Sequence, residues 1–322
     1  MDKIQRTVVG LLVMFSVFTQ HGCVTVNLLE PPGPVQEVQL SGSGDGKVLL
    51  LDLSGVISSQ DKEGWLPQPN LLATFKEELT KASKDEKVKA VVLRINSPGG
   101  TVNASDILYH ELKTFKENRK IPVIASMMDV AASGGYYLAM ATDAILVHPS
   151  TVTGSIGVIM LTMNAKGLLE KVGVEANAIT SGPRKDMGSP FRSMTADEKE
   201  IFQGVIDSFY QRFLTVVQAG RPQLSTEQIK KLADGRIYSG DQAKAAGLVD
   251  DIGYLDEAID LAKKNAGLKE ARVVTYRRHG EYQNNIYSRV FGSGNGLSAL
   301  ASMDLLSLVR GGSPQFMYLW MP

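Results

Sequence analysis

Hydrophobic and polar positions repeat with two different periods along the chain after residue 47. Short continuous apolar runs predict buried strands, and apolar residues three and four apart predict amphipathic helices. The predicted strands are residues 48–57, 90–95, 122–128, 144–147 and 175–180. The predicted helices are residues 71–82, 104–115, 136–141, 165–172, 196–219, 225–232 and 239–246. This alternation predicts an α/β fold of right-handed β-α-β units, in which helices cover the faces of a sheet.

Local signals mark the ends of several predicted elements. Thr195 precedes the long helix and Glu198 stands three residues later, which is the capping-box pattern. The helices predicted at 225–232 and 239–246 each open on a serine. After Arg278 the pattern is broken by glycine and asparagine, but the chain ends in the apolar sequence FMYLWMP. Such an end is unusual for a free tail, so we expect it to dock on the protein.

The amino terminus has the pattern of an export signal. Basic residues precede an apolar run over residues 7–18, and a helix of that length rises only about 18 Å against a hydrocarbon core of roughly 30 Å. Gly22 before Cys23 resembles the lipobox of bacterial lipoproteins, in which the thiol is lipidated, although Gln20 replaces its usual leucine. The alternative is an uncleaved membrane anchor. Either interpretation places the remaining chain outside the cytoplasm, tethered to a membrane.

The segment after this leader differs in composition from the rest. Residues 24–46 contain the sequences PPGP and SGSG, which combine stiff and flexible stretches. We interpret the segment as a spacer between the membrane and a compact domain that starts near Lys47.

Composition and charge narrow the function classes. The chain has 322 residues, of which 43% are hydrophobic and 21% charged, as in ordinary globular proteins. Lys and Arg (34) balance Asp and Glu (34), so no basic surplus points to nucleic acid as a partner. Cys23 is the only cysteine, which excludes an intramolecular disulfide and a site with several thiolate ligands.

Ser133 is the first candidate for chemistry. An apolar strand stops at small residues around Ser133, and a helical pattern begins at Tyr136, so the hydroxyl lies where a strand turns into a helix. Free backbone N–H groups at such a turn can stabilise negative charge on a substrate oxygen. Ser133 could therefore act as a nucleophile. The alternative is that it only caps the helix.

A second turn, NSPGG at residues 96–100, follows another buried strand. Two glycines let the backbone turn sharply and aim N–H groups at a bound carbonyl, at the strand end where α/β sheets bind ligands. The turn suits an oxyanion hole. An ordinary turn is the alternative.

Two kinds of base could activate Ser133. A Ser-His-Asp triad would use His148 with Asp129 or Asp143. Lys185 would act as a base only when neutral, and lowering a lysine pKa from about 10.4 towards 7 or 8 costs of order 4 kcal/mol. From the residues alone, we interpret Lys185 as a solvated loop lysine.

Five segments together resemble the signal peptide peptidase A (SppA) family of serine peptidases. They are NSPGG at 96–100, DVAASGGYY at 129–137, TGSIGV at 153–158, SGPRKD at 181–186 and YSGDQA at 238–243. The chain is similar to the short, single-unit form of that family. The resemblance implies a ClpP/crotonase-like fold, a repeated β-β-α superhelix with helices flanking the sheets. It also implies a peptidase domain over 47–268, with 269–322 as a C-terminal strand and a partly irregular tail.

The resemblance also implies the site. Ser133 corresponds to the nucleophile and Lys185 to the general base, and Ser155 corresponds to the serine that orients the lysine amine. Gly100 and Gly134 would supply the oxyanion N–H groups, with Gly99 as the fallback for Gly100.

No metal or cofactor is implied. The implied partners are remnant signal peptides as substrates, a bacterial membrane, and further copies of the chain in a homo-oligomeric ring whose dyads are completed across subunits.

Two other classes of function stay open. A crotonase-like acyl-CoA enzyme would share the strand-turn-helix geometry but would rely on acidic residues near a thioester. The other class is a membrane-associated scaffold with a vestigial site, or a peptidase that acts on one partner protein rather than on signal peptides.

Overall fold

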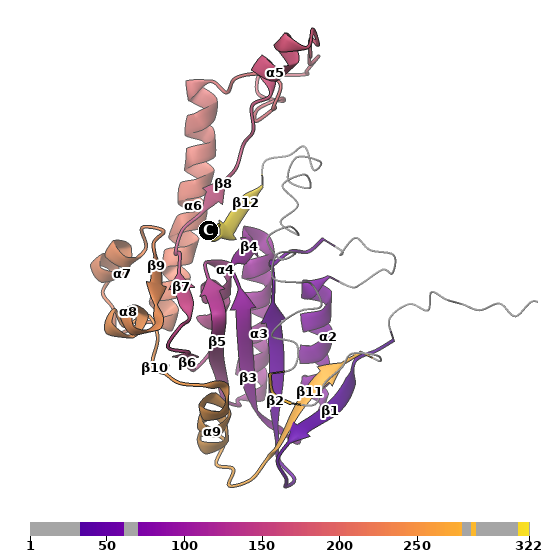
Figure 1. Cartoon of the computed structure of the whole chain (residues 1–322), viewed down its shortest axis with the longest axis vertical. Helices are drawn as coiled ribbons and strands as arrows, with labels where there is room; N and C mark the ends of the chain where they lie inside the picture. The colour runs from indigo at the N-terminus through magenta and orange to yellow at the C-terminus, as the bar shows by residue number, and fades with distance from the viewer. Residues whose placement is uncertain (1–32, 61–69, 279–284, 288–314, 322) are drawn as a thin grey trace, which may run out of the picture.

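The computed structural model describes residues 33–60, 70–278, 285–287 and 315–321. Within these residues the main sheet has nine strands, in the order β1-β11-β2-β3-β5-β6-β10, with β7 and β9 continuing from β5 (Figure 1). Its strands are β1 Gln36–Ser41, β2 Lys47–Ser54, β3 Val88–Ser97, β5 Val123–Ala132, β6 Ala144–Val147, β7 Val152–Gly154, β9 Ile237–Ser239, β10 Asp251–Ile252 and β11 Arg272–Arg277. A second sheet consists of β4 Gly99–Thr101, β12 Phe316–Leu319 and β8 Ile159–Met160.

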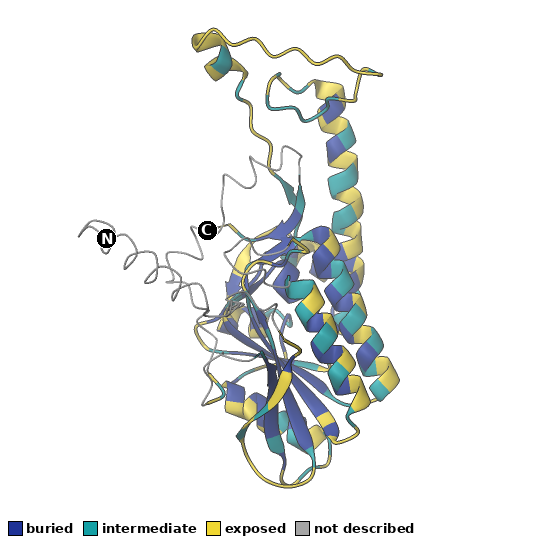
Figure 2. Ribbon diagram, turned by 90° about the vertical axis from the view of Figure 1, so that its right-hand side faces the viewer, coloured by how far each residue is buried: buried dark blue, intermediate teal, exposed yellow. Residues whose placement is uncertain are grey.

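Helices cover both faces of the main sheet (Figures 1 and 2). The helices of the described residues are α2 Leu71–Lys84, α3 Val102–Arg119, α4 Gly134–Ala139, α5 Lys166–Lys171, α6 Ala196–Gly220, α7 Thr226–Leu232, α8 Gly240–Ala245 and α9 Leu255–Asn265, of which α5 lies away from the sheet. Alternate residues of β2 separate into two cores. Leu49 and Leu51 pack on the side of α2 and α3, whereas Val48 and Leu50 pack on the side of α9. Because both faces are covered, the parallel strands are nearly continuous apolar runs.

The expected α/β class, with helices flanking the sheet, is confirmed. β2, β3, β5 and β6 are parallel neighbours, and β3, β4 and α3 form one β-β-α unit. The capping box is also confirmed, because the Glu198 amide donates to the Thr195 hydroxyl at 3.2 Å and the Thr195 amide donates to the Glu198 carboxylate at 2.9 Å. Ser225 and Ser239 cap α7 and α8 as expected.

The spacer interpretation is wrong for residues 36–41. They form β1, which pairs antiparallel with β11, and β11 in turn pairs parallel with β2. Lys47 fixes this edge by donating to Glu37 and Asp85, each at 2.7 Å. Burial disfavours the Lys47 ammonium, but its bonds to Asp85 and Glu37 outweigh that effect and raise its pKa. The strand is half exposed and mostly polar, so its composition resembled a linker.

The strand predicted at residues 175–180 is also wrong. Those residues have no regular structure and belong to an arm, residues 161–195, that projects from the body beside the start of α6 (Figure 1). Val174 is half exposed and Ile179 is fully exposed. No strand in the described part of the chain pairs with this segment. The alternation of polar and apolar residues in EANAIT therefore mimicked a strand.

No helix in the described ranges is long and apolar enough to cross a membrane. The expected leader, 1–23, and with it Cys23, lies outside the residues that the structure describes.

Candidate active site

Ser133 sits on a strained turn between β5 and α4. Its backbone has φ 50° and ψ −112°, a conformation that residues with a side chain rarely adopt. The residue is 1% exposed, its hydroxyl makes no capping bond, and its Oγ has no hydrogen-bond partner among the described residues. The geometry therefore disfavours a mere helix cap and leaves a buried hydroxyl without a partner among the residues that the structure describes.

The two glycine segments meet beside Ser133. A β-carbon on Gly99 would stand 2.7 Å from the Gly134 amide nitrogen, and one on Gly134 would stand 2.5 Å from the Ser105 Oγ. Gly100 is held from behind, because the Ile57 amide donates to the Gly99 carbonyl and the Thr101 amide donates to the Ile57 carbonyl. The Gly100 N–H therefore faces the opposite side, towards β12.

Ser155 is brought next to the serine turn by strand pairing. β7 runs parallel to β5 with Ala132 opposite Gly154, and the Ser133 amide donates to the Gly154 carbonyl at 2.7 Å. Ser155 follows immediately, is buried, and also has a φ of 50°. Two strained serines thus stand at neighbouring strand ends.

Lys185 is not brought to Ser133 within one chain. It is exposed in the arm loop that precedes α6, and its neighbour Arg184 binds Asp197 in the first turn of α6 at 2.6 Å. The Ser133 region contacts the other half of α6, where Tyr137 packs on Phe213. The helix between Asp197 and Phe213 is about 24 Å long.

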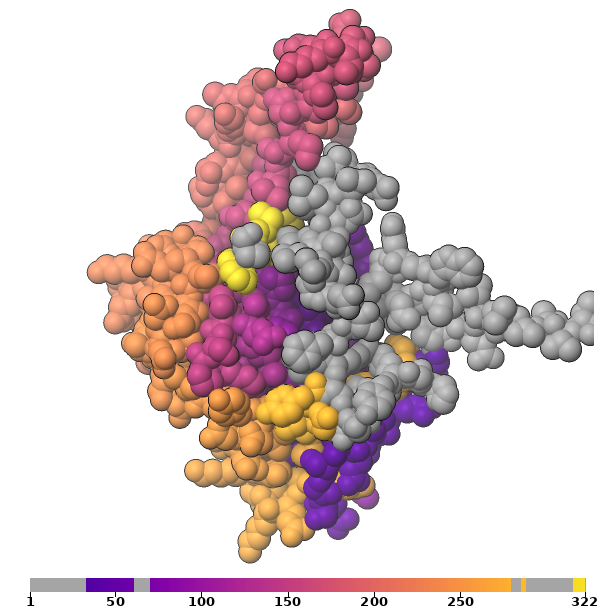
Figure 3. All heavy atoms as spheres, viewed as in Figure 1, coloured from indigo at the N-terminus to yellow at the C-terminus, as the bar shows by residue number. Residues whose placement is uncertain are grey.

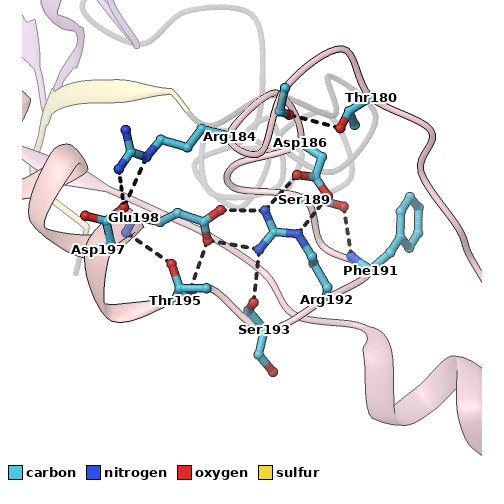
Figure 4. A network of polar contacts seen from close by, with 11 residues as sticks. Thr180, Arg184, Asp186, Ser189, Phe191, Arg192, Ser193, Thr195, Asp197 and Glu198 are labelled. Atoms are coloured by element: carbon cyan, nitrogen blue, oxygen red, sulfur yellow. Dashed lines mark hydrogen bonds and ion pairs between the residues drawn. The ribbon is translucent and has the colours of Figure 1, made fainter.

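A charged network orders the arm loop that carries Lys185 (Figure 4). Arg192 donates to Asp186 at 2.7 Å and to Glu198 at 2.5 Å. Hydrogen bonds from Arg192 and from the Thr195 amide hold the pKa of Glu198 at about 2. These ion pairs therefore anchor the loop at the start of α6. The Lys185 side chain takes no part in them and is exposed.

His148 does not join Ser133. Its amide pairs with the Met127 carbonyl at 3.3 Å, five to six residues before Ser133 on β5, which corresponds to roughly 16 Å or more along the strand. Burial lowers the pKa of His148, against the opposing charge of Asp129, and its ring packs against Tyr254. The Ser-His-Asp alternative is therefore not assembled. In the described ranges no three possible metal ligands gather at one place.

The C-terminal strand lies across the site. β12 runs antiparallel to β4 on one side and to β8 on the other (Figure 1), so the expected docking of the apolar end is confirmed. Figure 3 shows the yellow C-terminal atoms against the body of the protein. The Tyr318 carbonyl oxygen is 2.0 Å from the position that a β-carbon of Gly99 would take, so only glycine permits this approach. We refer to the channel between β4 and β8 as the groove.

The side chain of Tyr318 fills an aromatic pocket that sequence reasoning missed. The ring stacks on Tyr137 at 5.1 Å and packs on Phe213 at 4.7 Å, and its hydroxyl donates to the Phe209 carbonyl at 2.8 Å. Burial raises the pKa of Tyr318, so the hydroxyl stays a neutral donor. The available signal was the aromatic stripe along α6, at residues 202, 209 and 213.

Comparisons with known proteins show which families and structures this chain is similar to. The family model "Peptidase family S49" matches residues 115–269, and the model "Clp protease" matches residues 70–153. The "Putative signal peptide peptidase SppA" of Enterococcus faecium is 39% identical over 75% of this chain and 70% of its own length. The "Putative protease slr0021" of Synechocystis is 40% identical over 70% and 77%. Among solved structures, a ClpP1 variant from Listeria monocytogenes is similar with a TM-score of 0.42 and 19% identity, over 65% of this chain and 94% of that one.

Proposed function

The chain belongs to peptidase family S49, and we propose that it is a membrane-tethered serine endopeptidase in which Ser133 and Lys185 form a catalytic dyad. The observation that carries the proposal is the buried Ser133 Oγ, which has no partner in the described part of the chain and sits on a strained turn beside two glycine amides. Its substrates are remnant signal peptides and other membrane-associated peptides, as the name of the Enterococcus relative suggests.

The geometry supports an acyl-enzyme mechanism. The Ser133 Oγ attacks the peptide carbonyl while the neutral Lys185 amine takes the hydroxyl proton. The amides of Gly100 and Gly134 donate to the oxygen that becomes negatively charged. The lysine passes its proton to the leaving amine, and water then hydrolyses the acyl-enzyme. Ser155, beside the nucleophile, orients the lysine amine.

The lysine reaches the serine of a neighbouring subunit in this proposal. Within one chain Lys185 is on the arm, and the arm exposes large apolar side chains that water-facing loops rarely carry together. Those that are at least half exposed are Met163, Leu168, Val172, Val174, Ile179 and Phe191 (Figure 2). Packing this arm against a second copy in a ring would bury these side chains and remove water from around the lysine.

Mixing two inactive variants tests the shared site. Ser133→Ala and Lys185→Ala should each be inactive on a fluorogenic peptide, and a mixture of the two should recover activity, because some interfaces then hold an intact serine and an intact lysine. Lys171→Ala, on the same arm, is the matched control and should stay active. Activity of Lys185→Ala at the wild-type rate would exclude the dyad, and two dead variants that never complement would exclude sharing.

The tether is proposed to be a lipid on Cys23. Cys23→Ser should abolish incorporation of labelled palmitate and release the protein from the membrane fraction. Retention of Cys23→Ser in the membrane without label would instead indicate an uncleaved anchor.

A further inference from the structure

We infer that Asn96, oriented by Asp129, is a positioning residue of the peptidase site: its side chain holds a bulge in β5 that sets Ser133 beside the oxyanion turn. The inference rests on the proposed function and adds to it the residues that bring the nucleophile and the oxyanion donors together. Asn96 and Asp129 begin the segments NSPGG and DVAASGGYY, and the proposed function leaves both residues without a role.

The pairing of β3 with β5 shifts register just before the site. Ile95 on β3 pairs with Met127 on β5. The next pair along the two strands is Ser97 with Ala131. One residue therefore separates the two pairs on β3, whereas three residues separate them on β5. Such an insertion is a β-bulge, which bends its strand and re-aims the side chains beyond it.

The bulge decides which residue of the oxyanion turn lies beside the nucleophile. Two residues beyond the last pair, Gly99 comes level with Ser133. Accordingly, a β-carbon on Gly99 would stand 2.7 Å from the Gly134 amide nitrogen. Without the two extra residues, Ser133 would lie two positions further along, level with Thr101 and about 7 Å past Gly99. The bulge therefore places the proposed nucleophile beside the proposed oxyanion donors.

The side chain of Asn96 takes the place of a strand-pairing bond that the bulge removes. The Val130 amide, inside the bulge, donates to the Asn96 Oδ1 at 3.2 Å. Because a backbone N–H can only donate, this bond fixes the orientation of the side-chain amide. Its nitrogen then faces the Asp129 carboxylate and donates to it at 3.4 Å. The Asn96 backbone carbonyl accepts from the Gly55 amide at 2.9 Å, so the residue joins β5 to the end of β2.

The other edge of the bulge is held by two threonines of the β7 segment. Thr151, fully buried and one residue before β7, donates its hydroxyl to the Met128 carbonyl at 2.5 Å. The Thr153 hydroxyl donates to the Ala131 carbonyl at 2.7 Å. At the same place β5 changes its neighbour from β6 to β7. Polar side chains therefore hold the bulge on both sides, and Asn96 holds it on the side of the oxyanion turn.

Active-site titration on the full chain separates positioning from folding. A fluorophosphonate probe that reacts with the nucleophilic serine counts intact sites, and turnover of a fluorogenic peptide then gives kcat per site. Asn96→Ala should lower kcat per site roughly thirtyfold with KM changed less than about twofold, because a displacement of about 1 Å in the site can cost about a hundredfold. A merely structural role would lower the number of sites and the melting temperature and leave kcat per site unchanged.

The matched control is Asn70→Ala. The Asn70 Oδ1 also accepts one backbone N–H, from Ala73 at 2.8 Å, but it caps α2, which packs on α3 and β2. Its loss should lower the melting temperature, as loss of a helix cap does, and keep the wild-type kcat per site. An equal fall in kcat per site in both asparagine variants would overturn the inference.

Exchanging the two side chains tests their contact directly. In Asn96→Asp two carboxylates would face each other, so kcat per site should fall at least as far as in Asn96→Ala. Adding Asp129→Asn restores one amide and one carboxylate, and the double variant should recover at least about tenfold of the loss. A double variant no more active than Asn96→Asp would overturn the role of this pair.

Thr151→Val decides if Asn96→Ala yields no folded chain. It removes the hydroxyl at the other edge of the bulge and keeps a branched side chain of similar size. It should therefore show the same selective loss of kcat per site, and Thr151→Ser, which keeps the hydroxyl, should recover most of that loss. Wild-type kcat per site in Thr151→Val would overturn the inference.

Hydrogen exchange needs no catalysis. The Val130 amide, followed in peptides covering residues 127–132, should exchange at least about tenfold faster in Asn96→Ala than in wild type or Asn70→Ala. If wild type neither reacts with the probe nor turns over substrate, the proposed function is overturned, and faster exchange in Asn96→Ala would still support the bulge. Wild-type exchange and wild-type turnover in Asn96→Ala would overturn this inference and keep the function.

Discussion

The body and the arm of this protein differ in how far they bury the proposed catalytic residues. In the body, Ser133, Ser155 and the glycine turns are buried and held by strand pairing within one chain. In the arm, Lys185 is exposed on a loop whose apolar neighbours also face solvent. The difference is that one chain buries the proposed nucleophile and oxyanion donors, whereas it exposes the proposed base. Under the function we propose, a single subunit would be inactive and activity would require assembly.

The largest effect should come from the body. Ser133→Ala should lower kcat/KM by roughly 10³-fold or more, because it removes the nucleophile. Ser126 is a matched control: it lies on the same strand, is fully buried, and its Oγ also lacks a partner in the described ranges. Ser126→Ala should retain nearly wild-type activity in the same assay. Equal losses in both variants would mean that packing, rather than nucleophilicity, explains the result.

Charge clusters in the two regions should differ in the stability they carry. In the body, Asp52 is shared by Arg94, at 2.5 Å, and Arg277. Both arginines are buried, and the Asp52 side chain is 9% exposed. Asp52→Asn leaves buried positive charge uncompensated and should lower the free energy of unfolding by about 3 kcal/mol or more, measured by urea denaturation. In the arm, Asp186→Asn should shift the urea midpoint far less, since its ion pair with Arg192 is more exposed than the Asp52 cluster. A larger shift for the arm variant would reverse the comparison.

A charged residue introduced into the arm should weaken subunit assembly without lowering the stability of the single subunit. Ile179 is fully exposed in one chain, so Ile179→Asp should leave the melting temperature of the isolated subunit unchanged. If that side chain is buried between subunits, a carboxylate there should dissociate the oligomer in light scattering and reduce activity roughly tenfold or more. Lys171→Gln is the exposed control on α5. An Ile179→Asp ring of normal size and activity would show that this part of the arm is not an interface.

The smallest effect should appear on acidification. Arg192 and the Thr195 amide lower the pKa of Glu198 to about 2, and hydrogen bonds from Arg192 also lower that of Asp186. A carboxylate with a depressed folded pKa stabilises fully above its ordinary value and loses that contribution as pH falls through the folded value. Ordering of the arm loop should therefore persist at pH 5 and weaken between about pH 4.5 and pH 2.

Hydrogen exchange of residues 186–198, corrected for its intrinsic pH dependence, measures that loosening. Arg192→Gln should already be loose at pH 5. Protection in wild type that is equal at pH 5 and pH 2.5 would contradict the assignment of the loop's order to these charges.

Sequence reasoning succeeded where the signal was local. The Thr195 and Glu198 box, the serine caps of α7 and α8, and the strand that ends at Ser133 are set by residues within one or two turns of each other. It failed at residues 36–41 and 175–180. The first is a polar strand that exists because β11 lies beside it. The second alternates polar and apolar residues as a strand would, but it is exposed and unpaired in the described part of the chain.

The sequence by itself determined the alternating elements, the strand-to-helix turn at Ser133 and the family motifs, because each depends on short-range periodicity and backbone preference. Only the tertiary structure decided that Gly154 presents Ser155 beside Ser133, that Lys185 stands at the other end of α6, and that Tyr318 closes the groove. Those juxtapositions join residues tens to hundreds of positions apart. Their energy comes from shared burial and strand pairing, which no single stretch of chain encodes.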